Sequence, residues 1–196
     1  MIPLQRSRPD TIVLDLEIAN EISHVITWDR TDLMKIACVV VYHYNHNMFE
    51  IFSEHDIDRL RSLIITSDLI VGYNIIKFDL PIIFGERSGR SYSDIHVFDI
   101  LASICKNLGL DPREFSNAHK GWSLNAVAKA TLGMQKSGQG AIAPVLWKQG
   151  RYIEVINYCM HDVMLTRNLY DHIKQEGWAA SATTRTSVRW DMETIP

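Results

Sequence analysis

The stretch Thr11-Ile12-Val13-Leu14-Asp15-Leu16-Glu17-Ile18 is a β-branched and apolar run of the length expected for a buried strand. Because side chains alternate along a strand, Asp15 and Glu17 are predicted to share one face with Val13, while the even-numbered residues fill the other face. Like charges repel and buried carboxylates are costly, so either a cation lies between the two or one holds a proton. Hard cations such as Mg²⁺ and Mn²⁺ prefer oxygen ligands, which makes this strand a candidate metal-binding element.

A further carboxylate lies on a predicted helix near the end of the chain. Residues 151–174 contain no proline or glycine. At 100° per residue, the side chain of Asp162 falls in the middle of a core-facing arc of about 80°. Tyr158 lies four residues earlier, one turn away on the same face, so a phenol and a carboxylate are predicted to point into one site.

The third acidic motif lies between these two. Residues 69–71 are a short buried-strand candidate, and a turn at residues 72–74 follows. Phe78-Asp79-Leu80-Pro81 is typical of the first turn of a helix, where proline is tolerated and an acidic residue is favoured by the helix dipole. That dipole is an alternative explanation of Asp79, so its role as a ligand or as a helix-start carboxylate stays open.

The three motifs together resemble a known family. D-x-E at Asp15 and Glu17, N-x-x-x-F-D from Asn74 to Asp79, and Y-x-x-x-D ending at Asp162 resemble the motifs of the DEDD superfamily of 3′-to-5′ exonucleases. That superfamily includes the proofreading domains of DNA polymerases, RNase D and RNase T.

The last motif resembles the tyrosine (DEDDy) branch. The histidine of the other branch would stand five residues before the last aspartate, where this chain has Asn157. Trp28, residues 35–43 and residues 70–74 look like a group of RNase H-like exonuclease domains that occur alone or attached to helicases. The resemblance extends over residues 11–172 and implies an α/β fold in which helices flank a mixed five-stranded RNase H-like sheet.

The resemblance also implies roles for the five motif residues. Two divalent cations, Mg²⁺ or Mn²⁺, would be bridged by Asp15. Glu17 and Asp162 would complete the ion on the side of the nucleophile, and Asp79 would hold the second ion. Tyr158 would orient the attacking water.

Four further residues are candidates for substrate binding. In relatives the backbone at the positions of Leu16 and Ile18 lies beside the terminal nucleotide. Asn74 and Phe78 are candidates for shaping the site or stacking a terminal base. The alternatives remain open, because asparagine after glycine commonly serves a turn and phenylalanine is commonly part of the core.

The 196 residues, 46% of them hydrophobic, are expected to form one exonuclease domain with a core at residues 11–174. Residues 175–196 are expected to be a tail that adds an edge strand or is disordered. The chain has no apolar stretch long enough to cross a bilayer and no signal-peptide features, so no membrane association is expected. Three cysteines in apolar runs indicate buried thiols in a reducing cytoplasm.

The net charge of −3 is unusual for a nucleic-acid-binding protein. Residues 112–151 nevertheless contain six basic side chains and one acidic side chain, and a glycine-rich basic loop at residues 133–140 is either a connector or a segment that closes over the substrate backbone.

The expected partner is the 3′ end of single-stranded DNA or RNA, with the chain working alone or with a helicase or polymerase. The sequence does not indicate an oligomeric state. The leading hypothesis is a metal-dependent 3′-to-5′ exonuclease that releases nucleoside 5′-monophosphates. An RNase H-like endonuclease or resolvase, and an inactive nucleic-acid-binding module, are the alternatives.

Overall fold

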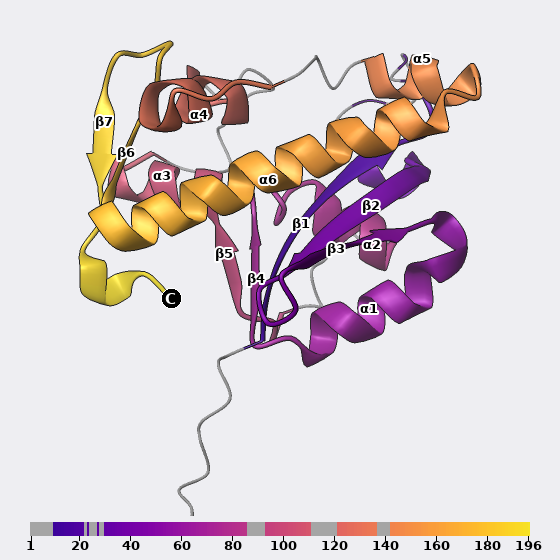
Figure 1. Ribbon diagram of the computed structural model, residues 1–196, viewed down its shortest axis with the longest axis horizontal. Helices are drawn as coiled ribbons and strands as arrows, with labels where there is room; N and C mark the ends of the chain where they lie inside the picture. Colours follow the sequence, from indigo (N-terminus) through magenta and orange to yellow (C-terminus); the bar gives the residue numbers. More distant parts are fainter. Residues whose placement is uncertain are drawn as a thin grey trace, which may run out of the picture.

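A five-stranded mixed sheet forms the centre of the protein in the computed structural model, which describes residues 10–21, 23, 27, 30–85, 93–110, 121–136 and 142–196 (Figure 1). The strand order is β3-β2-β1-β4-β5. The strands are β1 (Thr11–Ile18), β2 (Ile36–His43), β3 (Met48–Phe52), β4 (Leu69–Gly72) and β5 (Val97–Asp99). Strand β2 runs antiparallel to β1 and β3, whereas β1, β4 and β5 run parallel to one another. The predicted α/β, RNase H-like arrangement is confirmed. Trp28 lies outside the described residues.

Each face of the sheet packs against its own set of helices (Figure 1). The 25-residue helix α6 (Tyr152–Glu176) crosses one face, and Val13 of β1 packs with it in the α6-side core. The opposite face packs on α1 (Ile57–Thr66) and α2 (Asp79–Phe84) in the α1-side core. The even-numbered residues of β1 lie in that second core: Ile12, Leu14, Leu16 and Ile18. The predicted alternation along β1 therefore decides which helices each side chain meets.

The remaining helices lie at the carboxyl ends of β4 and β5 or beside α6. In the described part of the chain they are α3 (Ile100–Asn107), α4 (Leu124–Leu132) and α5 (Ala143–Lys148), and 3₁₀ turns occupy residues 31–33, 54–56 and 192–194. The Ser123 side chain caps the start of helix α4 by accepting a hydrogen bond from the Ala126 amide, and Gly133 adopts φ 68° directly after the last turn. Helix α5 was not predicted from the sequence.

The tail does not extend the central sheet, contrary to one sequence-based expectation. Strands β6 (Trp178–Ala180) and β7 (Ser187–Arg189) pair antiparallel with each other in a separate two-stranded sheet. Polar contacts hold this hairpin over α3 and α4: the Ala180 amide donates to Thr131 Oγ1 at 3.0 Å, and Trp190 Nε1 donates to Ser103 Oγ at 2.6 Å. These contacts place the hairpin on the helical layer and away from the edges of the sheet. Among the described residues, no helix combines the length and apolarity needed to cross a membrane.

Candidate metal centre

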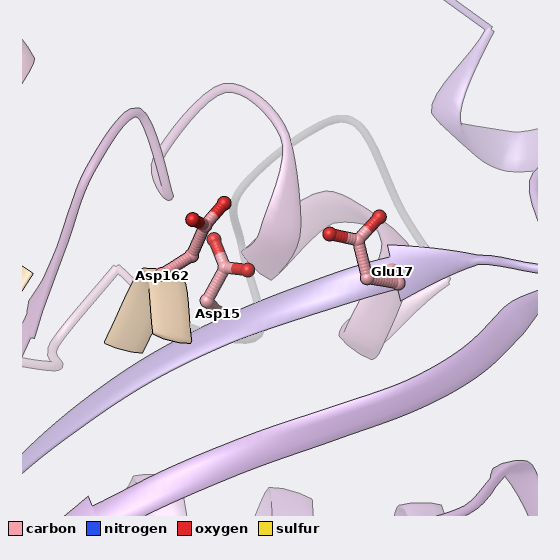
Figure 2. A group of neighbouring side chains, drawn as sticks. All are labelled: Asp15, Glu17 and Asp162. Atoms are coloured by element: carbon pink, nitrogen blue, oxygen red, sulfur yellow. The ribbon is translucent and has the colours of Figure 1, made fainter. Parts of the chain in front are cut away.

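Three of the predicted carboxylates come together between β1 and α6. Asp15 and Glu17 project from β1 toward the helix, and Asp162 projects from the middle of α6 toward the strand (Figure 2). One carboxylate oxygen of each lies within 4.8 Å of the other two. This acidic cluster consists of Asp15, Glu17 and Asp162. The carboxylates that strand alternation places on β1 and the carboxylate that helix periodicity places on α6 thus lie next to one another in the fold.

Burial makes the charged forms of the acidic cluster costly. Asp162 is 2% exposed and Glu17 7% exposed, whereas Asp15 is partly open to solvent. Burial, reinforced by the charge of Asp162, raises the pKa of Asp15 to about 7. Burial and the charge of Asp15 raise the pKa of Glu17 well above its usual value, and burial raises that of Asp162. Positive charge is therefore strongly favoured between these side chains, and carboxylate oxygens suit a hard divalent cation.

Two buried polar atoms at the acidic cluster indicate that a ligand binds there. The Asp162 Oδ1 atom and the Tyr158 hydroxyl are buried, and no described residue lies in hydrogen-bonding geometry with either. Tyr158 lies one turn before Asp162 on α6, as predicted. Burial raises its pKa to about 12, although the Lys136 ammonium acts in the opposite direction. Unpaired buried polar atoms are uncommon in folded proteins, so the donor set fits a cation together with a water molecule.

Lys136 is a member of the site that the sequence did not single out. Its ammonium forms an ion pair with Asp162 Oδ2 and lies 5.4 Å from the centre of the Tyr158 ring. Burial disfavours the ammonium form, but the charges of Asp162 and Asp15 outweigh burial and raise the pKa of Lys136. The available signal was its place in the basic loop at residues 133–140, of which residues 133–136 are described. Nothing in the sequence indicated that this lysine turns inward.

Asp79 approaches β1 from another direction and is not part of the acidic cluster. It is the first residue of α2, is 3% exposed, and its Oδ1 accepts a hydrogen bond from the Leu16 amide at 3.0 Å. Burial raises its pKa well above the usual value, and the charge of Asp15 adds to this increase, so the two carboxylates are close enough to repel. The structure brings Asp79 beside the strand that carries Asp15 and Glu17, and its role as a ligand stays a prediction.

The four proposed substrate-binding residues have structural roles of their own. The side chains of Leu16 and Ile18 are both 4% exposed and lie in the α1-side core, so only their backbone could contact a substrate. Asn74 adopts φ 67°, a left-handed conformation that asparagine tolerates, and its carbonyl accepts a hydrogen bond from the Phe78 amide. The Phe78 ring packs against the α1-side core. Contact of these residues with a substrate stays a prediction.

Asp99 positions the segment that leads to Asp79, a role that the sequence analysis missed. It is the N-cap residue of α3, and its carboxylate accepts hydrogen bonds from the amides of Asn74, Ile76 and Ala102 at 2.9, 3.1 and 3.1 Å. One buried side chain thus joins the turn after β4 to the start of α3. An aspartate directly before a helical run was the available signal.

Cys159 lies directly behind Asp15. Its thiol is fully buried and donates to the Asp15 carbonyl oxygen at 3.1 Å, with Oδ2 of the same residue at 3.6 Å. All three cysteines are buried thiols, as predicted. The contact of Cys159 ties α6 to β1 at the residue that carries the central carboxylate.

Comparison with known proteins identifies a fold. No model of a protein family matches the sequence, and no curated protein matches it. Among solved structures, the chain is similar to the family B DNA polymerase from the hyperthermophilic archaeon Pyrobaculum calidifontis, with a TM-score of 0.52 and 16% sequence identity. The match covers 85% of this chain and 25% of the polymerase, so the chain spans about a quarter of the polymerase's length. At this identity the similarity shows the fold alone.

Proposed function

We propose that this protein is a metal-dependent 3′-to-5′ exonuclease of the tyrosine (DEDDy) branch. It hydrolyses phosphodiester bonds at the 3′ end of single-stranded nucleic acid and releases nucleoside 5′-monophosphates. The observation that carries the proposal is the convergence of Asp15, Glu17 and Asp162 within 4.8 Å, with the Tyr158 hydroxyl one turn away on α6. The similarity in fold to a DNA polymerase is consistent with this function, because the motif resemblance includes polymerase proofreading domains.

Each residue has a defined task in this proposal. Asp15, Glu17 and Asp162 hold the cations, and Asp79 completes the ligand set. Divalent ions held by these carboxylates would offset the charge of the phosphate and lower the pKa of a bound water toward neutral pH. The Tyr158 hydroxyl orients the attacking water through a hydrogen bond. With a pKa of about 12 it stays protonated at neutral pH, so it orients the water and does not remove its proton.

The same observations weigh against an inactive binding module. Binding nucleic acid requires basic or aromatic surface and does not require buried carboxylates. Three acidic side chains held within 4.8 Å destabilise the fold unless a cation or proton offsets them. Their presence is therefore best explained by a metal-dependent reaction.

The test is a degradation assay with 5′-labelled single-stranded DNA and RNA of the same sequence, each with Mg²⁺, Mn²⁺ or EDTA. Wild-type protein is expected to shorten the substrate from its 3′ end, and EDTA is expected to stop the reaction. Asp162→Ala removes a ligand and is expected to abolish cleavage. Glu176→Ala, an exposed acid on the last turn of the same helix, is the matched control and should retain wild-type rates.

Three outcomes would contradict the proposal. Equal rates for Asp162→Ala and wild type would exclude the acidic cluster as the active site. Activity that persists in EDTA would exclude a requirement for divalent metal in the reaction. Cleavage of a circular single strand would identify an endonuclease built on the same sheet. The comparison of DNA with RNA also identifies the substrate class, which depends on contacts to the 2′-hydroxyl.

A further inference from the structure

Lys136 is held at the acidic cluster by a segment that is itself anchored. The Lys136 amide donates to Asn125 Oδ1 of α4 at 2.8 Å. The neighbouring Gln135 carbonyl lies 3.0 Å from Nε2 of His161, which precedes Asp162 on α6. The backbone of residues 135–136 is therefore attached to both α4 and α6, and the ammonium reaches Asp162 from a defined position.

The ion pair is sheltered from water. The side chain of Lys136 is 23% exposed and that of Asp162 is 3% exposed. Salt screens a pair of this kind less than a surface pair, and removing one partner leaves an uncompensated buried charge. The ammonium therefore stabilises the acidic cluster substantially.

One ammonium cannot satisfy the whole acidic cluster. It carries a single positive charge against three carboxylates, and Asp162 Oδ1 remains without a partner. A divalent cation bound by the same three side chains would share Asp162 with the ammonium. Two positive groups on one carboxylate repel each other strongly when both are shielded from water. The ammonium and the cation therefore compete for Asp162.

We propose that Lys136 is a built-in competitor for the metal site: its ammonium neutralises the acidic cluster when no divalent ion does so, and divalent ions bind by displacing it from Asp162. This inference rests on the metal site of the proposed function and adds that Lys136 regulates how much of that site is occupied by metal. The lysine keeps the fold stable at low metal concentration and sets the concentration above which the site fills.

The test measures Mn²⁺ affinity by titration calorimetry at about pH 7.5. Lys136→Met removes the charge and retains much of the apolar stem, and it is expected to bind Mn²⁺ at least about tenfold more tightly than wild type. Lys136→Arg retains the charge and should stay close to wild type. Lys148→Met is the matched control, because Lys148 forms an exposed ion pair with Glu21, and it should leave the affinity unchanged.

Thermal unfolding supplies a second measurement. Lys136→Met is expected to melt at a lower temperature than wild type in EDTA, and the difference should shrink in saturating Mn²⁺. If Lys136→Met does not fold in EDTA, Lys136→Gln is titrated in its place with the same expectation. If Lys136 only supported packing, Lys136→Met would lower the melting temperature by the same amount in EDTA and in saturating Mn²⁺. That result would overturn the inference.

The outcomes separate this inference from the proposed function. Suppose that wild type binds Mn²⁺ and that Asp15→Ala abolishes this binding. If Lys136→Met then binds Mn²⁺ no more tightly than wild type, the competition is overturned and the metal site is retained. Absence of Mn²⁺ binding in both wild type and Lys136→Met would overturn the metal site and the competition together.

Discussion

Replacing Asp15 with asparagine is expected to stabilise the protein in EDTA while removing its response to metal. The substitution keeps the size of the side chain and removes one charge from the acidic cluster. The asparagine oxygen can still accept the hydrogen bond of the Cys159 thiol, and its amide can donate to Asp162. The local geometry is therefore retained, and the change in stability reports the charge.

The magnitude follows from the pKa of Asp15, which rises from 3.8 to about 7 on folding. Between pH 3.8 and about pH 7 the Asp15 carboxyl is protonated in the folded protein and ionised in the unfolded chain. The free energy of unfolding therefore falls as the pH rises through this range, and the loss is complete above about pH 7. At about 1.4 kcal/mol for each pH unit, the full loss is about 4 kcal/mol. Asparagine does not titrate, so the variant does not show this loss.

The assay is urea unfolding of both proteins in EDTA, followed by circular dichroism from about pH 5 to about pH 8.5. The free energy of unfolding of Asp15→Asn, relative to wild type, is expected to rise by about 3 kcal/mol across this range. Asp58→Asn, at a surface side chain that is 91% exposed, is the control and should change stability by less than about 0.5 kcal/mol.

Excess Mn²⁺ should narrow the stability difference between the two proteins. Wild type should gain about 2.7 kcal/mol at a hundredfold excess over the dissociation constant, and the variant should gain little. A stability difference that stays constant with pH in EDTA would refute the reasoning, as would equal stabilisation of the two proteins by Mn²⁺.

Three further substitutions test other parts of the structure. Tyr158→Phe should lower the single-turnover rate by about 10²- to 10⁴-fold, because the water loses its orienting group, while calorimetry should show an unchanged Mn²⁺ affinity. Asp99→Ala should cost about 2 kcal/mol in urea unfolding, since three part-buried amides lose their acceptor; a cost below about 0.5 kcal/mol would argue against this role. Gly72→Ala should cost about 1 to 3 kcal/mol in the same assay, because the added Cβ would lie 2.1 Å from Ile75 Cγ2.

Local patterns along the chain predicted most of the central elements. The alternation in residues 11–18 assigned both faces of β1, and the long helical stretch from Arg151 was observed as α6 over Tyr152–Glu176. Ser123 and Gly133, residue types that commonly cap helices, lie at the two ends of α4. These features depend on neighbours a few residues apart, so they can be recognised without knowing the fold.

Long-range contacts were less accessible to sequence analysis. The tail contains a run that is compatible with a strand, but its partner is the other half of its own hairpin. Asp79 accepts a hydrogen bond from the backbone of Leu16, 63 residues away, a contact that the local sequence pattern does not reveal. The choice between competing partners depends on packing, which periodicity does not encode.

The sequence by itself determined the identity of the charged groups at the site and the side of each element on which they lie. Period-two and period-3.6 patterns place Asp15, Glu17, Tyr158 and Asp162 on faces that must be covered, because their neighbours are apolar. Only the tertiary structure decided that Lys136 turns inward to pair with Asp162 and that Cys159 supports Asp15. The physical reason is that a side chain's charge and periodicity are local properties, whereas its electrostatic partner is chosen by the energy of burying both groups together.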